Sequence, residues 1–363
     1  MSVNISYKKQ AGFFLIAIII LLAAVEGSAR AYEYVGQDCN LAKAEALSNI
    51  DFFSKLQICY DQQNIVYSYT PVDSIVPNQH FKTVNINNDG FRGPEIKSEK
   101  SNDDFRIIVI GGSTVFGSGL SNDDQTIPFE LYKKFNEKYA NVEVINAGIS
   151  SITSFEEVYH IKHKLVHLDP DMIIVYDGVN DIFYRVIDDP EIIESTDEFQ
   201  LKDFQKYLRS PVVFYRHILL PILHFDVLGS PSTDKPTALY DEQVSNNIAQ
   251  SWERRIAEFC QVAREHQFES VVVIQPSLSH GIKPLSDYER SIQLENIHRE
   301  RTFEKLIQKG KGLNECSLVL DFSDVFENTN AGVYIDQVHV NNLGNKIIAE
   351  KIYEKILHMV IEN

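Results

Sequence analysis

The stretch Arg106-Ile-Ile-Val-Ile-Gly-Gly-Ser-Thr114 decides how this chain folds. Its apolar run is typical of a buried strand, and the two glycines permit a tight turn where that strand ends. Ser113 then begins the next element, where its hydroxyl group can project into a cleft. The alternative is an ordinary glycine turn with a capping serine, because serine is a favoured residue at helix starts.

Further apolar runs follow, separated by segments with helical periodicity. The expected strands are 106–110, 142–146, 171–176, 270–275 and 317–321, and the expected helices are 124–139, 154–168, 242–267, 287–311 and 342–361. This alternation predicts an α/β fold whose parallel sheet is covered by helices on both faces. Ligands of such sheets bind beyond the carboxyl ends of the strands, which is where Ser113 lies.

Two other strand ends carry residues that could stabilise an oxyanion. Asn146-Ala-Gly148 ends with a residue that lets a backbone amide come close to a ligand. Gly178-Val-Asn-Asp181 places Asn180, a neutral amide donor, at the end of the next strand, and such a donor suits a charge that develops in a transition state. Each motif taken alone also fits an ordinary turn.

Asp336-Gln-Val-His339 lies just before the last expected helix and supplies an acid and a base three residues apart. In a turn, the carboxylate can face the imidazole, fix its tautomer and stabilise its protonated form. His339 could then take the proton of Ser113 and return it to a leaving alcohol. We therefore expect Ser113, Asp336 and His339 to be catalytic, with the oxyanion held by Ser113, Gly148 and Asn180.

Several other classes of protein fit the sequence poorly. The net charge of −17, from 51 acidic and 34 basic residues, disfavours binding to nucleic acid. Gly112 and Gly117 have the spacing of a nucleotide-binding phosphate loop. Ser118-Gly119 replaces the lysine and hydroxyl residue that such a loop requires, which argues against nucleotide binding. His160, His163 and His167 share a helix face with polar neighbours, which favours a solvated surface over a metal site. No metal and no organic cofactor is expected.

The first 31 residues are typical of a targeting segment. Lys8-Lys9 precede the uncharged apolar run from Ala11 to Val25, and Ala29-Arg30-Ala31 offers a cleavage site. The segment is therefore either a signal peptide cleaved after Ala31 or an uncleaved membrane anchor, and we favour the anchor. Both alternatives export the rest of the chain.

The remaining chain divides into an N-terminal extension and a larger domain. The extension, 32–104, has helical periodicity over 42–60 and is expected to pack on the domain 105–363. The alternation breaks over 182–241, an insertion that fits either a lid or substrate wall, or a helical pair that completes the core.

The four cysteines fall into two groups in this division of the chain. Cys39 and Cys59 lie in the same N-terminal segment and could pair in an oxidising compartment. Cys260 and Cys316 lie in or beside expected core elements and are interpreted as small buried apolar residues.

Taken together, these motifs resemble those of the SGNH hydrolases, the GDSL-type esterase and lipase superfamily. Ser113, Gly148, Asn180 and His339 match the four residues that name the family, although the first motif is Gly-Gly-Ser-Thr rather than Gly-Asp-Ser-Leu. The resemblance covers about 105–361. It implies a flavodoxin-like three-layer α/β/α sandwich with a five-stranded parallel sheet, a Ser-His-Asp triad and no cofactor. Asn88-Asp-Gly-Phe-Arg-Gly-Pro-Glu95 is similar to a stretch in membrane-anchored bacterial members.

The function that this resemblance implies is hydrolysis of carboxylic esters through an acyl-enzyme. The exported location favours O-acetyl groups of glycans as substrates, but small esters and lipids fit the family equally. The alternatives are an O-acyltransferase on envelope polysaccharide with the same triad, and a non-catalytic glycan-binding protein that has kept the fold. The expected partners are the ester substrate and, through the N-terminal segment, the membrane.

Overall fold

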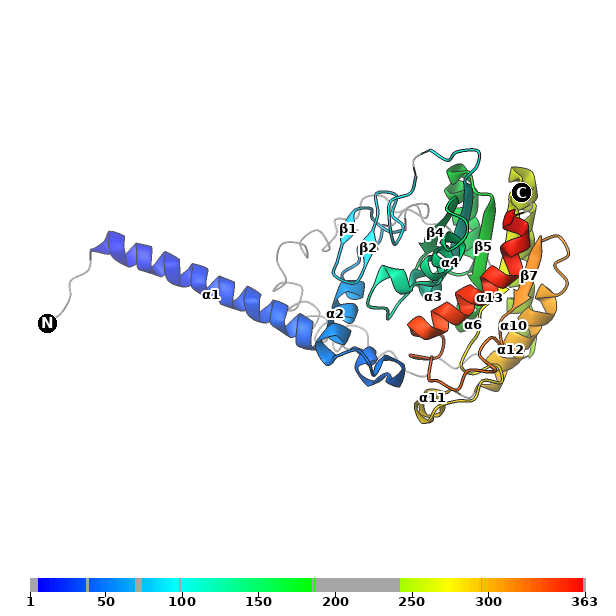
Figure 1. The fold of residues 1–363 in the computed structure, drawn as a ribbon. Coiled ribbons are helices and arrows are strands. Elements are labelled where there is room, and N and C mark those ends of the chain that lie inside the picture. Colours follow the sequence, from blue (N-terminus) through cyan, green and yellow to red (C-terminus); the bar gives the residue numbers. More distant parts are fainter. Residues whose placement is uncertain are drawn as a thin grey trace. The chain divides into compact units, whose positions relative to one another are not determined.

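The computed structural model describes residues 6–36, 39–68, 74–97, 99–184, 186, 242–294 and 296–361 (Figure 1). The chain forms two compact units. One comprises Met1–Cys39 and Thr196–Ala238, and the other comprises Asn40–Ser195 and Leu239–Asn363. Most of the predicted insertion, from residue 187 to 241, lies outside the described residues.

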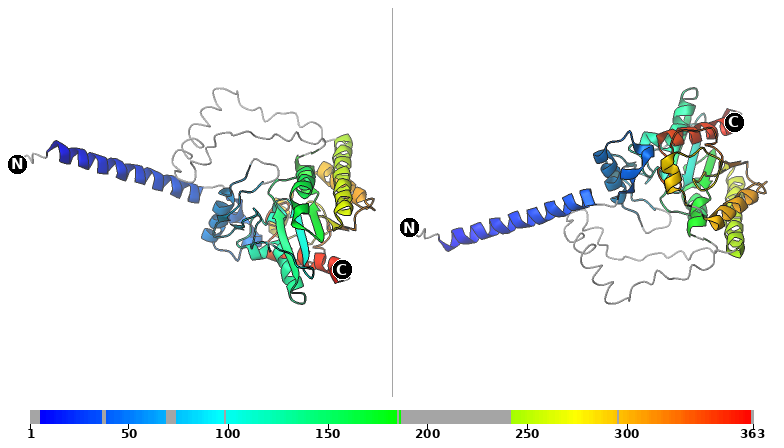
Figure 2. Two further views of the ribbon diagram at one scale, coloured as in Figure 1. Left: turned by 90° about the horizontal axis from the view of Figure 1, so that it is seen from above. Right: turned by 90° about the horizontal axis from the view of Figure 1, so that it is seen from below.

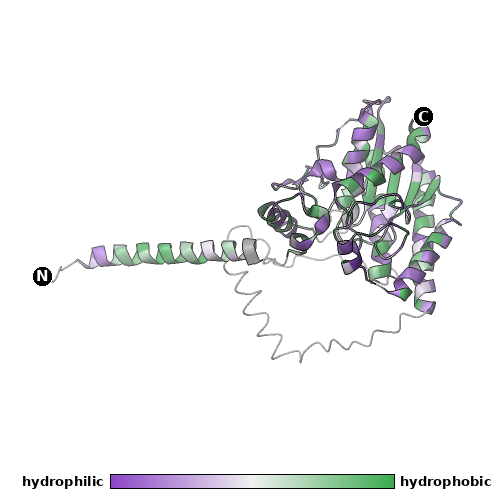
Figure 3. Cartoon of the chain, turned by 60° about the horizontal axis from the view of Figure 1, so that its bottom comes forward, coloured by the Kyte–Doolittle hydropathy of each residue, from purple (hydrophilic) through white to green (hydrophobic). Residues whose placement is uncertain are grey.

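The first unit contains one long helix, α1 (Tyr7–Gly36). Within it, Tyr7–Tyr32 is long and apolar enough to cross a membrane, and its most apolar 18 residues have a mean hydropathy of 2.3 (Figure 3). The helix extends beyond the uncharged run Ala11–Val25, and within this part Arg30 forms an ion pair with Glu26 one helical turn earlier, at 2.8 Å. The helix continues past Ala31 without a break.

The second unit is built on a five-stranded parallel sheet, as predicted. Its strands are β3 (Phe105–Gly111), β4 (Val142–Gly148), β5 (Met172–Asp177), β6 (Glu269–Ile274) and β7 (Leu318–Asp321). They are arranged in the order β4-β3-β5-β6-β7. The register places Gly111 opposite Gly148 on one side and Tyr176 on the other, so three of the candidate motifs meet at one edge of the sheet.

Helices cover both faces of this sheet (Figures 1 and 2). Alternate side chains of β3 show the division: Ile107 packs with one helical layer, whereas Ile108 packs with the other. One layer contains α4 (Ile127–Asn136) and α13 (Asn342–Ile361), and the other contains α5 (Ser154–His163), α10 (Glu242–His266) and α12 (Ile297–Gly310). Short helical elements complete the unit: α3 (Ser113–Phe116), η3 (Asp123–Gln125), η4 (Leu165–Leu168), α6 (Val179–Tyr184) and α11 (Asp287–Ile292).

Several of the expected helical segments are interrupted, most clearly 287–311 and 42–60. The segment 287–311 forms α11 and α12 instead of one helix, because the Asn296 side chain accepts hydrogen bonds from the amides of His298 and Arg299 and starts a new helix. The segment 42–60 is likewise not one helix. It contains η1 (Asn40–Lys43), η2 (Glu45–Leu47) and the start of α2 (Phe52–Gln63), which Asp51 caps.

Individual contacts join residues of the extension to residues near the end of the chain. Leu47 and its neighbours form a small apolar cluster with Ile335, and the Asn341 side chain donates to the carbonyl oxygen of Ala46. A two-stranded antiparallel sheet follows, made of β1 (Gln79–His80) and β2 (Asn85–Ile86). The extension therefore contacts Ile335, the residue directly before Asp336 in the sequence.

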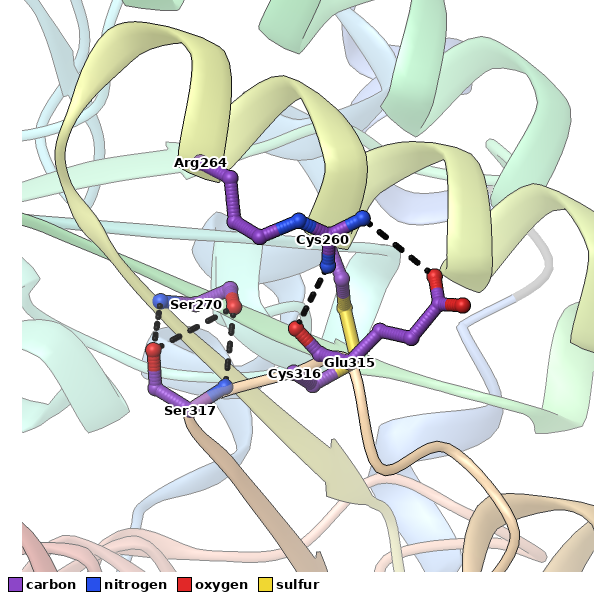
Figure 4. The surroundings of a disulfide bond; sticks show 6 residues. All are labelled: Cys260, Arg264, Ser270, Glu315, Cys316 and Ser317. Carbon is purple, nitrogen blue, oxygen red and sulfur yellow. Dashed lines mark hydrogen bonds and ion pairs between the residues drawn. A yellow bond between two sulfur atoms is a disulfide. The ribbon is translucent and has the colours of Figure 1, made fainter.

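All four cysteines are disulfide-bonded. The interpretation of Cys260 and Cys316 as free buried thiols is wrong, because they form a disulfide that joins α10 to the start of β7 (Figure 4). Arg264 strengthens the same junction by donating to the carbonyl oxygen of Glu315 at 2.8 Å. Cys39 and Cys59 are also disulfide-bonded.

Candidate active site

Ser113 begins α3, directly beyond the carboxyl end of the internal strand β3. The two glycines before it are required by close contacts. A Cβ atom at Gly111 would lie 2.5 Å from the carbonyl oxygen of Tyr176, and one at Gly112 would lie 2.5 Å from Nδ2 of Asn180. The backbone can make this turn only without side chains, which explains the Gly-Gly-Ser motif.

Asp336 and His339 form a closed turn. Oδ1 of Asp336 accepts hydrogen bonds from the amides of Val338 and His339, each at 2.9 Å. Its second oxygen, Oδ2, lies 2.7 Å from Nδ1 of His339. The backbone also closes around the turn, since the amide of Ile335 donates to the carbonyl oxygen of His339. The imidazole is therefore fixed relative to the carboxylate.

The other nitrogen of this imidazole reaches the serine. Nε2 of His339 lies 2.7 Å from Oγ of Ser113, although the two residues are 226 positions apart in the sequence. Because a carboxylate can only accept a hydrogen bond, Nδ1 carries the proton and Nε2 is left to accept from the hydroxyl group. The three side chains thus form one continuous chain of hydrogen bonds.

The electrostatics of the turn favour a charged carboxylate. Partial burial works against ionisation of Asp336, but the imidazole of His339 and the two backbone amides outweigh it and hold the pKa of the carboxyl group below its ordinary value of 3.8. An ionised carboxylate stabilises the imidazolium that would form when His339 takes a proton.

Asn180 lies in the first turn of α6, beside Gly112. Its Nδ2 donates to the carbonyl oxygen of Ile152, in the loop after β4, at 2.6 Å. An amide group has two N–H donors, so this bond fixes the orientation of the side chain and leaves the second N–H group for another acceptor. The structure therefore brings Asn180 to the same edge as Ser113.

Gly148 is placed differently from the other candidate residues. Its amide donates to Oδ1 of Asn146 at 3.0 Å. A Cβ atom at this position would overlap the backbone nitrogen of Phe116, so Gly148 packs against α3. The need for a glycine here comes from the close approach of strand and helix.

The sequence interpretation missed several residues that hold this site together. Asp181 accepts from Ser154 at both the amide, at 3.0 Å, and the hydroxyl group, at 2.5 Å, and so ties α6 to α5. Asp181 also forms a buried ion pair with Arg255 at 3.3 Å. Its position next to Asn180 was the only signal in the sequence. Ser151, in the same loop as Ile152, has a positive φ of 70°.

Gln337 anchors the turn between Asp336 and His339. Its Oε1 accepts from the hydroxyl group of Ser279 at 3.1 Å and from the amide of Leu294 at 3.2 Å. Its own carbonyl oxygen accepts from the amide of Leu278 at 2.8 Å. No pattern in the sequence pointed to these contacts, because they join segments that are about forty or more residues apart.

Three buried acidic side chains interact here, one each from α5, the end of β5 and α6. Glu157 is fully buried, and burial followed by the charges of Asp177 and Asp181 raises its pKa well above 4.5. Burial and the Asp181 carboxylate also raise the pKa of Asp177 well above its ordinary value, although Nε1 of Trp252 donates to it at 3.0 Å. A protonated Glu157 limits the negative charge of this cluster.

The histidines at 160, 163 and 167 do not share one environment. His163 and His167 are exposed, as predicted. His160 is buried, and its Nε2 lies 2.7 Å from Oγ of Ser74, so the prediction of a solvated face is wrong at this position. Within the residues that the structure describes, no group of three or more His, Cys, Asp or Glu side chains has the arrangement of a metal site.

With this geometry in place, the family can be identified. The sequence pattern of the GDSL-like lipase/acylhydrolase family matches residues 107–352, and the chain belongs to that family. Its members are serine hydrolases that act on esters, and the five-stranded α/β fold agrees with them. No curated protein matches the chain.

Several solved structures are similar to this one at low sequence identity. An acetyl xylan esterase has a TM-score of 0.40 at 13% identity, covering 69% of this chain and 100% of its own. The structure of TesA has a TM-score of 0.42 at 14% identity, covering 69% and 97%. A catalytic mutant of an acetylxylan esterase from Geobacillus stearothermophilus has a TM-score of 0.41 at 13% identity, covering 71% and 96%.

Proposed function

We propose that this protein hydrolyses carboxylic esters with Ser113 as nucleophile, His339 as general base and Asp336 as the residue that orients the base. The observation that carries the proposal is the hydrogen-bond chain from Oγ of Ser113 to Nε2 of His339 and from Nδ1 to Asp336, with both distances at 2.7 Å. Such a chain raises the reactivity of an otherwise weak hydroxyl nucleophile.

The reaction follows from these positions. Oγ of Ser113 attacks the ester carbonyl while His339 takes the hydroxyl proton, and a tetrahedral oxyanion forms. His339 then gives this proton to the leaving alcohol as the ester C–O bond breaks, which leaves an acyl-enzyme. Water attacks the acyl-enzyme with the same base, releases the acid and restores Ser113.

The oxyanion needs hydrogen-bond donors that are already in place. The proposed donors are the amide of Ser113, at the start of α3, and the free N–H group of the Asn180 side chain. Gly148 is the third donor expected from the sequence. Its amide would first have to exchange its bond to Asn146, so we expect it to contribute less than the other two.

The proposed substrates carry short acyl groups, with O-acetylated glycans as the favoured class. The support is a small cavity of about 30 Å³ that is lined in part by Val179, which precedes Asn180, and by Gln337, which lies between Asp336 and His339 in the sequence. The apolar helix α1 and the two disulfides indicate an exported protein, which would meet glycans outside the cytoplasm. Transfer to an added sugar acceptor, faster than hydrolysis, would favour the acyltransferase instead.

Replacing the nucleophile tests the proposal. The full chain in detergent should hydrolyse p-nitrophenyl acetate faster than longer esters, and Ser113→Ala should lower kcat by roughly four orders of magnitude or more. Ser118→Ala, five residues further on, is the matched control and should retain activity. A Ser113→Ala protein with undiminished activity would refute the nucleophile, and no turnover by the wild-type chain on any ester would favour a non-catalytic glycan-binding protein.

A further inference from the structure

Arg92 is a charged side chain buried deep in the domain, at 2% exposure. It belongs to the extension, in the stretch Asn88-Asp-Gly-Phe-Arg-Gly-Pro-Glu95, which precedes the part of the chain that matches the family pattern. A tight turn directs it inward. Oδ1 of Asn87 accepts from the amides of Asp89 and Phe91, and Gly90 has a φ of 82° that favours glycine.

The contacts of Arg92 lead to the helix that carries Ser113. Its Nη1 donates to the carbonyl oxygens of Phe116 and Gly117, at 3.0 and 2.8 Å. The guanidinium group also lies over the ring of Phe116, 5.1 Å from its centroid. Both carbonyl groups lie at the C-terminal end of α3, and Ser113 is the first residue of the same helix.

Two further bonds fix the guanidinium group itself. Nε forms an ion pair with Asp123 at 2.7 Å, and Nη2 donates to the carbonyl oxygen of Thr83 at 3.0 Å. Burial lowers the pKa of Arg92, and the carboxylate of Asp123 opposes this effect. Asp123 is in turn held by the amide of Asn85, at 3.1 Å. The extension and the segment after α3 thus form one cross-linked support.

The helix α3 needs such a support because it is only one turn long. A single turn of helix is marginal by itself, since its nucleation costs more than one hydrogen bond returns. Its last carbonyl groups have no helical partners, and a cation at that end interacts favourably with them. Arg92 supplies both the missing donors and the charge.

We propose that Arg92 is a positioning residue for Ser113, which it holds in place through the C-terminal carbonyl groups of α3. The inference rests on the proposed role of Ser113 and assigns a catalytic contribution to the extension. The turn at 87–92 then contributes to catalysis indirectly, by positioning Arg92, and none of its residues touches the reacting atoms.

Substitution of Arg92 should slow the chemical step more than it weakens substrate binding. Arg92→Met removes the charge and all donors, and Arg92→Lys keeps the charge but cannot form the same fork of bonds. We expect kcat on p-nitrophenyl acetate, and the rate at which a fluorophosphonate probe labels Ser113, to fall roughly 10- to 100-fold in Arg92→Met. KM should change less than about threefold, since the ester-binding surface is untouched. Arg92→Lys should recover part of the rate.

The chain offers a matched control at the opposite end of β3. Arg106 is also buried, its Nε forms an ion pair with Glu143 at 2.7 Å, and its other nitrogens donate to the carbonyl oxygens of Leu168 and Lys97. Its contacts are of the same kind as those of Arg92. However, Arg106 lies at the N-terminal end of β3, whereas Ser113 lies beyond the C-terminal end of that strand. Arg106→Met should therefore destabilise the protein without slowing the labelling of folded molecules.

All variants are compared in the full chain, below the unfolding transition of each, with near-UV circular dichroism as the test of folding. Should Arg92→Met not fold, Arg92→Lys and Asp123→Asn take its place, and both should label Ser113 more slowly than Arg106→Met does. Equal labelling rates for folded Arg92 variants and the wild type would overturn the inference and leave the proposed function intact. A wild-type chain that is not labelled at all would instead refute the role of Ser113.

Discussion

Glu157 shows how a single side chain can make stability depend on pH. It is fully buried, and neither carboxyl oxygen has a hydrogen-bond partner among the described residues. Its pKa in the folded state is raised well above 4.5, so the folded chain holds this proton at pH values where the unfolded chain has lost it. This contribution to stability is complete below pH 4.5 and is lost as the pH rises towards the folded-state pKa.

Glu157→Gln should remove that loss, because an amide of nearly the same shape does not ionise. Relative to the wild type, the free energy of unfolding of the variant should therefore be higher at pH 8 than at pH 5, by up to about 1.4 kcal/mol for each unit of raised pKa that the interval spans. Urea unfolding at the two pH values measures the difference. The exposed Glu304→Gln serves as control, and an equal effect of Glu157→Gln at both pH values would contradict the argument.

At the same scale, the candidate residues were easier to find in the sequence than the residues that hold them in place. Ser113, Asn180 and the Asp336–His339 pair lie in recognisable motifs, and the structure brings them together, but their catalytic roles stay predictions. Gln337 lies within the Asp336–His339 motif and Arg92 in a stretch that resembles other family members, but neither pattern gives these two residues a role, since the contacts of both depend on segments that meet only after folding. Gly148 illustrates a different limit: a glycine motif marks a close approach, but the sequence does not say whether a ligand or a helix makes that approach.

Among the elements, α10 and β7 are joined by the disulfide between Cys260 and Cys316, which are separated by 56 positions in the sequence. Paired hydrogen bonds between Ser270 and Ser317, each from an amide to a hydroxyl group at 3.1 Å, align β6 and β7 at the same place (Figure 4). The disulfide therefore ties the edge strand β7 to the helix α10.

Removing this disulfide should lower the free energy of unfolding by roughly 4 kcal/mol, the value expected from the entropy of closing a loop of this length. The Cys260→Ala/Cys316→Ala double variant, compared with the wild type by urea unfolding, provides the measurement. Arg264→Ala loses only the exposed contacts to Glu315 and should cost less than about 1 kcal/mol. A double variant as stable as the wild type would show that the sheet edge needs no covalent closure.

The elements also show where hydrophobic periodicity succeeds and where it fails. All five core strands were predictable, because each contains an apolar run, although the edge strand β7 is only partly buried. The break between α11 and α12 was not, since the apolar pattern continues across it and only the cap formed by Asn296 divides it. In 42–60 the same pattern reflects contacts of 3₁₀ turns with Ile335, and a periodicity of apolar residues does not distinguish these turns from a helix.

For the whole molecule, the open question is the fate of α1. We expect the full chain to remain in the membrane fraction after washing at high salt, with an N-terminus upstream of Ala31, because Tyr7–Tyr32 is long enough to span a bilayer. Fractionation and N-terminal sequencing of the exported protein measure this. A soluble chain that begins at Tyr32, together with membrane retention of Ala31→Leu, would instead establish a cleaved signal peptide.

The predicted boundary between the extension (32–104) and the larger domain (105–363) stays a prediction. The contacts indicate where this boundary should be placed. The compact unit that holds the sheet already begins at Asn40. Arg92, Leu47 and Asn341 all contribute contacts between the extension and the sheet domain. We therefore expect that removing 40–104 would disturb the folding of the remainder.

The distance along the chain between Ser113 and His339 has a consequence for when activity arises. During synthesis Ser113 emerges 226 positions before His339, the base of the proposed triad. Folding proceeds largely from the N-terminus as the chain appears, so the nucleophile strand can form while the hydroxyl group still lacks a proton acceptor. On the proposed mechanism, a chain truncated before His339 would therefore carry an inert serine.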